Sequence, residues 1–263
     1  MSDIRLLAVD LDNTLLTAEK KISAKNKYWI QKTGEQGIKV VLATGRGVER
    51  TREFWEELSL NDPLVLVNGA ELWKTPGELL ERHTLTGEEA KILIGLALKN
   101  KAGYWGYNLE GMVRSSDWTE KMYIQRWLKI GFKHEDISVI QRLKKEVQSL
   151  NHYAVTQSGP LNLEISPWGT SKAYGLKKIC AYLQIDLDSV MAIGDNLNDL
   201  EMIQTAGLGV AVENADKRLK LAADALTASN EADGVAEAIR RYIFKAGSKG
   251  LEVRKNEFAS KKD

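Results

Sequence analysis

Two carboxylates stand two residues apart directly after a short apolar run near the start of the chain. Asp10 and Asp12 follow residues 4–9, and Asn13 and Thr14 come next. Alternate residues of an extended strand share a face, so two acids at this spacing repel each other unless a cation lies between them. An Asp- and Asn-rich segment of this kind is, taken alone, also typical of an ordinary turn.

A second acidic loop follows another apolar run late in the chain. Residues 190–193 are apolar, and residues 194–199 read Gly-Asp-Asn-Leu-Asn-Asp. A helix cap would explain one of these acids but not four polar residues within five positions. Mg²⁺ prefers hard oxygen ligands, with waters completing an octahedral shell. The sequence therefore predicts a magnesium site that includes Asp195.

Two further loops offer groups that bind anions. Thr44, Gly45 and Arg46 follow a third apolar run, and a hydroxyl beside glycine amides makes an anion-binding concavity. Lys172 follows Ser171, whose side chain predicts a helix N-cap. A cation at a helix N-terminus is unfavourable to the helix dipole, which indicates a compensating anion. Taken singly, these segments also fit an ordinary turn and a solvated lysine.

The four loops are more informative together, because they lie within an alternation of strands and helices. Strands are expected over residues 4–9, 39–43, 64–67, 190–193, 208–212 and 225–227, and helices near 23–37, 48–58, 176–183, 200–206 and 231–244. This alternation predicts an α/β fold with a doubly wound, Rossmann-like parallel sheet. Ligands bind at the carboxyl ends of such strands. The acids would gather there around Mg²⁺ and a phosphate group, an arrangement suited to phosphoryl transfer.

The pattern changes between about residues 75 and 170. All three histidines and four of the seven tryptophans lie in this part of the chain. Helices are expected over residues 88–99 and 119–130, together with a strand over 161–165. The change in composition and periodicity indicates an inserted module.

The expected domain division follows from this change. Residues 1–78 and 168–245 would form the catalytic core, and residues 79–167 an inserted α+β cap domain. The basic segment 246–263 has few apolar residues and is expected to be a disordered tail.

Composition argues against several classes of protein. The 263 residues are 43% hydrophobic and 28% charged, which is ordinary for a soluble globular protein. A net charge of +1 gives no field that attracts nucleic acid or an anionic membrane, and no apolar run reaches the ~20 residues of a spanning helix. The early first strand leaves no room for a secretory signal, and the single Cys180 forms no internal disulfide. We therefore expect a cytoplasmic protein, monomeric or homodimeric, without nucleic-acid or membrane partners.

The chemical loops resemble the sequence motifs of a known family. Asp10-Leu11-Asp12-Asn13-Thr14, Thr44-Gly45-Arg46, Lys172 and residues 194–199 are similar to the four motifs of the haloacid dehalogenase superfamily of phosphohydrolases, in the family's order. Asn68-Gly69-Ala70 and residues 227–236 resemble its Cof-type branch, which carries a type II (IIB) cap between the second and third motifs. The resemblance covers roughly residues 1–75 and 165–244. The cap is identified by its position and is somewhat short for that branch.

The resemblance implies roles for the acidic residues. Asp10 would be the nucleophile that forms an aspartyl-phosphate, and Asp12 the general acid and then the general base. Mg²⁺ would be bound by Asp10, Asp195 and the main-chain carbonyl of Asp12. Asp199 would lie in the outer shell of the metal or hold Lys172. This division of roles predicts that the turn rotates the Asp12 side chain away from Asp10.

The resemblance also implies how the phosphoryl group is held. Thr44, Gly45 and Lys172 would bind its oxygens, and Asn198 would lie beside it. Arg46 is a candidate substrate contact, although a structural salt bridge explains it equally well. The implied activity is Mg²⁺-dependent hydrolysis of a small phosphorylated metabolite such as a sugar phosphate. A phosphotransferase or phosphomutase with the same intermediate remains an alternative. A phosphorylation-controlled binding module is a further one, which Asp12 and the cap disfavour.

The remaining conspicuous residues have plainer interpretations. The aromatic run Tyr104-Trp105-Gly106-Tyr107-Asn108 could stack on a ring of the substrate, but aromatic residues in a small inserted domain more often form its core, which we favour. The three histidines show no metal-ligand spacing. Cys180 falls on the apolar face of its expected helix and should be buried.

Overall fold

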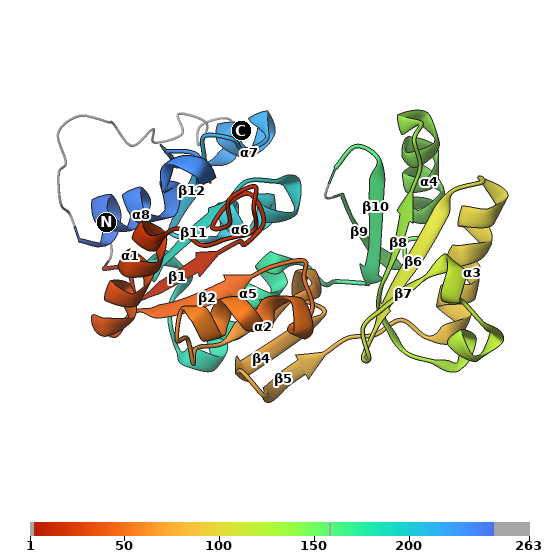
Figure 1. Cartoon of the computed structure of the whole chain (residues 1–263), viewed down its shortest axis with the longest axis horizontal. Coiled ribbons are helices and arrows are strands. Elements are labelled where there is room, and N and C mark those ends of the chain that lie inside the picture. The colour runs from red at the N-terminus through yellow and green to blue at the C-terminus, as the bar shows by residue number, and fades with distance from the viewer. Residues whose placement is uncertain (1–2, 158, 245–263) are drawn as a thin grey trace, which may run out of the picture.

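The computed structural model describes residues 3–157 and 159–244. The expected tail, residues 246–263, lies outside this part of the chain. Two sheets form, one of eight strands and one of five, and each has its own apolar core (Figure 1). The expected α/β core with an inserted cap domain is confirmed.

The core sheet is parallel over most of its width. Its strand order is β13-β12-β11-β1-β2-β3-β4-β5. The strands are β1 (Leu6–Val9), β2 (Lys39–Ala43), β3 (Leu64–Leu66), β4 (Glu71–Thr75), β5 (Glu78–Arg82), β11 (Val190–Gly194), β12 (Leu208–Val212) and β13 (Ala225–Thr227). Every residue of β1, β11 and β12 is buried, as in a sheet covered on both faces. β4 and β5 continue the sheet as an antiparallel edge.

Helices connect the parallel strands. They are α1 (Ala24–Glu35), α2 (Val48–Glu57), α5 (Lys172–Leu183), α6 (Leu200–Thr205), α7 (Lys217–Ala222) and α8 (Gly234–Ala238). The Ser23 and Ser171 side chains cap α1 and α5 as expected. The expected helix over residues 231–244 is divided, because Asp233 adopts a left-handed conformation (φ 60°) before α8. Among the described residues, no helix has both the length and the apolarity needed to cross a membrane.

The edge strands β4 and β5 were not predicted by the hydrophobic pattern. They carry many charged residues, and the Arg82 Nε donates to the buried Glu71 carboxylate at 2.6 Å. A domain boundary after residue 78 would fall inside β5, which pairs with β4 in the core sheet. We therefore propose that the core continues to Arg82 and that the cap begins after it.

The cap is a five-stranded antiparallel sheet covered by two helices. Its strand order is β7-β6-β8-β10-β9, with all pairs antiparallel. The elements are α3 (Gly87–Lys99), β6 (Gly103–Asn108), β7 (Met112–Arg114), β8 (Trp127–Lys133), α4 (Ile137–Ser149), β9 (Tyr153–Thr156) and β10 (Asn162–Pro167). α3 and α4 pack on the face of the sheet that points away from the core (Figure 1). The opposite face is turned towards the catalytic core.

The expected helix over residues 119–130 is wrong. Glu120–Ile124 form a short 3-10 helix, and β8 begins at Trp127. Short apolar runs of this kind are ambiguous in their periodicity, and pairing with β6 and β10 on both sides makes the segment a central strand. Trp127 is fully buried in the cap core. The expected helix over 88–99 and strand over 161–165 correspond to α3 and β10.

Candidate active site

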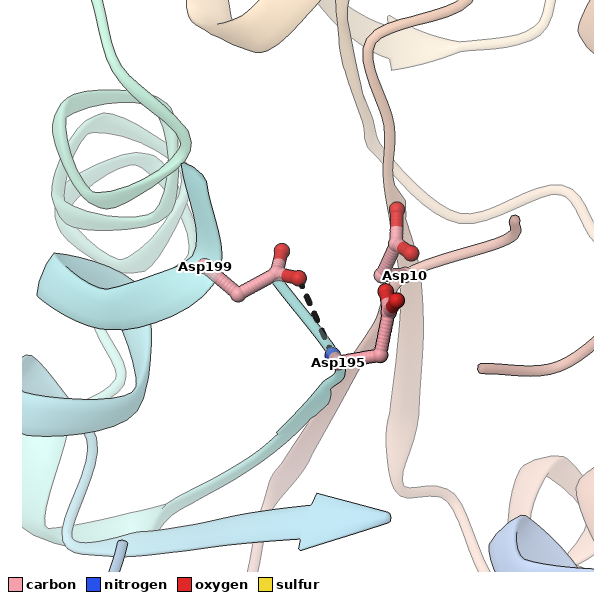
Figure 2. Close-up of side chains that lie close together, drawn as sticks. All are labelled: Asp10, Asp195 and Asp199. Atoms are coloured by element: carbon pink, nitrogen blue, oxygen red, sulfur yellow. Dashed lines mark hydrogen bonds between the residues drawn. The ribbon is translucent and has the colours of Figure 1, made fainter. Parts of the chain in front are cut away.

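Three buried carboxylates converge at the carboxyl ends of two neighbouring strands. β1 and β11 pair in parallel with Val9 opposite Ile193, so Asp10 and Asp195 emerge at the same edge of the sheet. Asp199 joins them from the following turn (Figure 2). One oxygen of each carboxylate lies within 4.8 Å of the others.

The acidic cluster is held by backbone and hydroxyl donors. The Asp199 Oδ2 accepts hydrogen bonds from the backbone N–H groups of Asp195 and Asn196, each at 3.1 Å, and Figure 2 shows the first. The Thr14 hydroxyl donates to Asp195 Oδ1 at 3.2 Å. These contacts form a short capping turn at the start of α6 and fix the orientation of both carboxylates.

Lys172 provides the cation next to this cluster. It is fully buried at the start of α5, and its Nζ lies 2.6 Å from both Asp10 Oδ1 and Asp199 Oδ1. Both oxygens of Asp199 are therefore engaged by protein donors, which supports the role of holding Lys172. Three carboxylates against one ammonium leave a surplus of negative charge. Hard oxygen donors with such a surplus suit a divalent cation such as Mg²⁺.

The pKa values of the cluster agree with that interpretation. Burial raises the pKa of Asp10 well above its usual range, against the opposing effect of Lys172. Burial, followed by the nearby charge of Asp199, raises the pKa of Asp195 to about 6. A divalent cation bound between these carboxylates would favour their charged forms.

Asp12 faces different partners from Asp10. Arg46 binds its carboxylate with two hydrogen bonds of 2.7 Å, and Lys20 adds a third at 2.9 Å. Burial would raise the pKa of Asp12, but the hydrogen bonds from Arg46 and Lys20 outweigh that effect and lower it. Asn13 follows with a left-handed backbone (φ 58°). The Asp12 side chain thus lies outside the carboxylate cluster, as the expected division of roles requires.

The anion-binding candidates lie at neighbouring strand ends. Thr44 and Gly45 follow β2, and the Thr44 hydroxyl oxygen accepts a hydrogen bond from the backbone N–H of Arg46 at 3.2 Å. The Asn198 amide nitrogen donates to Asn68 Oδ1 at 3.2 Å. Asn68 itself sits in a left-handed turn (φ 54°) and was not among the predicted site residues.

A cavity of about 330 Å³ lies above these groups, between the core and the cap. The predicted site residues that line it are Asp10, Asp12, Thr44, Gly45, Arg46, Asp195 and Asn198. Lys172 and Asp199 are buried behind Asp10 and do not belong to the lining. The cap contributes Trp105, Tyr107, Met112, Lys129, Thr156, Gln157 and Glu164.

The aromatic run in β6 divides between the two faces of the cap sheet. Tyr104 packs edge-to-face with Trp118 in the cap interior, with ring centres 5.6 Å apart. Trp105 and Tyr107 point the other way and line the cavity. The interpretation as cap core therefore holds for Tyr104 but is wrong for its two neighbours. The alternation of a strand, with a period of two, was the signal that would have separated them.

Two charged residues of the cap, the buried Lys129 and the partly buried Glu164, were missed. Lys129 in β8 pairs with Glu164 in β10 at 2.7 Å, and both line the cavity. A lysine inside an apolar strand is a recognisable signal, but the helix expected over residues 119–130 obscured it. Cys180 is buried as expected, and burial raises the pKa of its thiol to about 11. No histidine belongs to a metal-binding cluster in the part of the chain that the structure describes.

The chain belongs to the haloacid dehalogenase-like hydrolases. The model of that family matches residues 7–137 and 113–239. A relative from Bacillus subtilis (strain 168), the 5-amino-6-(5-phospho-D-ribitylamino)uracil phosphatase YcsE, is 36% identical over 242 residues, which cover 92% of this chain and 97% of that protein. The protein is therefore a phosphatase of this family.

Solved structures show the same fold. A haloacid dehalogenase-like hydrolase from Bacteroides thetaiotaomicron has a TM-score of 0.78 at 29% identity and covers 91% of this chain and 99% of its own. The subclass IIB sugar phosphatase BT4131 has a TM-score of 0.80 at 22% identity, covering 90% and 98%. The resemblance to the Cof-type branch with a type II cap is confirmed.

Proposed function

We propose that the protein is a Mg²⁺-dependent phosphatase that hydrolyses a small phosphorylated metabolite through an aspartyl-phosphate on Asp10. The observation that carries this proposal is the position of Asp10. Its carboxylate lies at the base of the cavity, hydrogen bonded to the buried Lys172 and grouped with Asp195 and Asp199. A nucleophile for phosphoryl transfer needs this combination of a fixed carboxylate and nearby positive charge.

The residues of the chain divide the two chemical steps between them. In the first, Asp10 bonds to phosphorus as the bond to the leaving oxygen breaks, and Asp12 gives that oxygen a proton. In the second, Asp12 takes a proton from the water that attacks the phosphorus, and Asp10 is released. Mg²⁺ held by Asp10, Asp195 and the Asp12 carbonyl would neutralise charge on the phosphoryl group. Lys172, which lies behind Asp10, would balance the charge of Asp10 and of the phosphoryl group bonded to it, with Asp199 fixing its position.

The contacts of Asp12 add a requirement to this scheme. Its carboxylate is bound by Arg46 and Lys20, which favour the charged form. Protonation of the leaving oxygen therefore requires that these ion pairs loosen when substrate binds. The substrate phosphate is a suitable competitor for Arg46, because a guanidinium binds phosphate and carboxylate oxygens in the same two-pronged manner.

The substrate proposal rests on the cap side of the cavity. The Bacillus subtilis relative is named for 5-amino-6-(5-phospho-D-ribitylamino)uracil, whose leaving group joins a polyol chain to a ring. Trp105 offers an aromatic surface, and Lys129, Thr156 and Glu164 offer polar groups. We propose this compound as the first candidate, with sugar phosphates as the second.

The test is release of inorganic phosphate by the purified protein. A panel of phosphorylated metabolites and p-nitrophenyl phosphate would be assayed with Mg²⁺ and with EDTA, for the wild type and the Asp10→Asn variant. Mg²⁺-dependent release that Asp10→Asn abolishes is the expected result. A burst of alcohol release without matching phosphate would instead indicate a phosphotransferase, if an added acceptor sugar restored turnover. No release from any compound would contradict the proposal.

A further inference from the structure

One row of residues crosses the cavity-facing side of the cap sheet. The strand registers place Arg114, Trp105, Gly131, Glu164 and Thr156 opposite one another in β7, β6, β8, β10 and β9. Gly131 lies at the centre of this row. A Cβ atom there would lie 2.0 Å from Trp105 Cε2, so the absence of a side chain is what allows the indole to lie over β8.

Lys129 lies close to this row and is paired with Glu164. It is only 5% exposed, and its Nζ lies 2.7 Å from Glu164 Oε2 and 3.0 Å from the backbone oxygen of Gly45. The Trp105 ring centre is 5.4 Å from the same nitrogen. Two of the three N–H donors of this ammonium are used by oxygens, and its positive charge is balanced by the Glu164 carboxylate. A second anion beside Lys129 would therefore have to compete with Glu164 for the same positive charge.

Glu164 supplies the opposing negative charge. Its Oε2 accepts from Lys129 and, more distantly, from Asn68 Nδ2 at 3.4 Å. In the part of the chain that the structure describes, both of these hydrogen bonds to the Glu164 side chain end on Oε2. The second oxygen, Oε1, can accept from an O–H or N–H group of a ligand in the cavity.

The other cations of the cavity are committed or remote. Arg46 binds Asp12 and, in the proposed function, the substrate phosphate, while the Lys20 side chain is half exposed to water. Arg114, at the β7 end of the row, is exposed and does not line the cavity. Arg50 is exposed at the rim, where water screens its charge. A second anionic group on the substrate would therefore be buried beside Glu164 without a cation of its own, and an unpaired buried charge is strongly unfavourable.

We propose that the Lys129–Glu164 pair makes the cap select leaving groups that are neutral and rich in O–H and N–H donors, and reject those with a second anionic group. This inference rests on the proposed phosphatase function and assigns Glu164 and Lys129 as its specificity-determining residues. Polyol and amino-pyrimidine phosphates belong to the accepted class, and phosphorylated sugar acids to the rejected class.

The test compares two substrates that differ by one carboxylate. Sorbitol 6-phosphate and 6-phosphogluconate have the same chain length and phosphate position. The wild type should show a kcat/KM at least about tenfold higher for sorbitol 6-phosphate, because the buried cation on the cap side of the cavity, Lys129, is already paired with Glu164. This comparison needs no variant, so it stands even where a substitution impairs folding.

Two substitutions should change the ratio of kcat/KM for sorbitol 6-phosphate to kcat/KM for 6-phosphogluconate in opposite directions. Glu164→Gln leaves Lys129 without its carboxylate and should lower the preference for sorbitol 6-phosphate about tenfold, because it removes one negative charge from a site that is largely shielded from water. Lys129→Met leaves Glu164 unpaired and should raise the preference by a similar factor. Damage to the cap alone would lower kcat/KM for both substrates in proportion and leave their ratio unchanged. Glu146→Gln, which removes a cap carboxylate paired with Lys99 away from the cavity, should also leave it unchanged.

Each outcome decides the inference. Equal or better hydrolysis of 6-phosphogluconate by the wild type would overturn it, as would a ratio that neither variant moves. Turnover of p-nitrophenyl phosphate without turnover of sorbitol 6-phosphate would also overturn it, while leaving the phosphatase function intact. Absence of turnover of p-nitrophenyl phosphate and every other ester would overturn the phosphatase function itself, and this inference with it.

Discussion

Replacing Gly47 by alanine should hold the cap away from the loop that follows β2. Gly47 precedes α2 in an extended conformation that any residue can adopt (φ −87°, ψ −179°), so the backbone imposes no strain. A Cβ atom there would lie 1.9 Å from the Tyr107 Oη, and real Cβ atoms essentially never approach below 3.0 Å. Tyr107 must therefore move by at least 1.1 Å (3.0 − 1.9).

The size of the effect follows from what Tyr107 would lose. Its side chain is 6% exposed, and its hydroxyl is hydrogen bonded to Glu49 in α2, which links the cap to the core. A hydrogen bond to a charged group contributes about 1.5–3 kcal/mol. Loss of that contact from the closed state should lower kcat/KM about 10- to 100-fold for the metabolite that the wild type hydrolyses best.

The assay is steady-state phosphate release, with circular dichroism to confirm that the variant is folded. Gly34→Ala in α1 is the matched control, because no atom lies within 4 Å of its added Cβ. Adding Tyr107→Ala to Gly47→Ala removes the clash, so the two losses should not be additive. Two results would refute the inference that the contact between Tyr107 and Glu49 holds the cap on the core. One is a Gly47→Ala enzyme as active as Gly34→Ala, and the other is a double variant whose loss in kcat/KM equals the combined losses of the two single variants.

The remaining predictions concern the acidic cluster and the cysteine. Asp10→Asn should lower kcat at least about 10³-fold without lowering the urea midpoint, since it removes one of three clustered buried carboxylates; substantial residual turnover would count against Asp10 as nucleophile. Lys172→Met should destabilise the metal-free protein by about 3–5 kcal/mol in urea unfolding, whereas Lys74→Met, at an exposed pair, should cost under about 1 kcal/mol; similar losses would contradict the cluster's electrostatics. EDTA should abolish phosphate release and added Mg²⁺ should restore it with a higher melting temperature, and activity that persists in EDTA would exclude a metal requirement. With a Cys180 pKa of about 11, only about one thiol in a thousand is ionised at pH 8, so a thiol reagent should react only after unfolding; rapid reaction of the native protein would disprove the burial.

The core of the protein could be predicted largely from its sequence. The loops of Asp10, Thr44 and Asp195 each follow a buried apolar strand, and parallel strands that pair in register bring their carboxyl ends to one edge. The grouping of Asp10 with Asp195 is therefore a consequence of local pattern and sheet geometry. The N-caps at Ser23 and Ser171 are equally local, because a cap depends on residues within one helical turn.

The charged strands β4 and β5 and the cap strand β8 could not be predicted from the hydrophobic pattern of the sequence. Half of the residues of β4 and β5 are charged, and these strands form because β4 pairs with β3 and β5 pairs with β4. β8 is a strand because β6 and β10 flank it, although its apolar spacing also fits a helix. Pairing between remote segments outweighs local preference at both places.

The amino-acid sequence by itself determined the catalytic motifs, the family and the position of the insertion. Only the tertiary structure decided which side chains surround the leaving group. Lys129 contacts Glu164 and Gly45, which lie 35 and 84 positions away in the chain, and Arg46 meets Asp12 across 34 positions. A local pattern contains no information about such partners, because they depend on how the cap sheet is paired and on where it closes over the core.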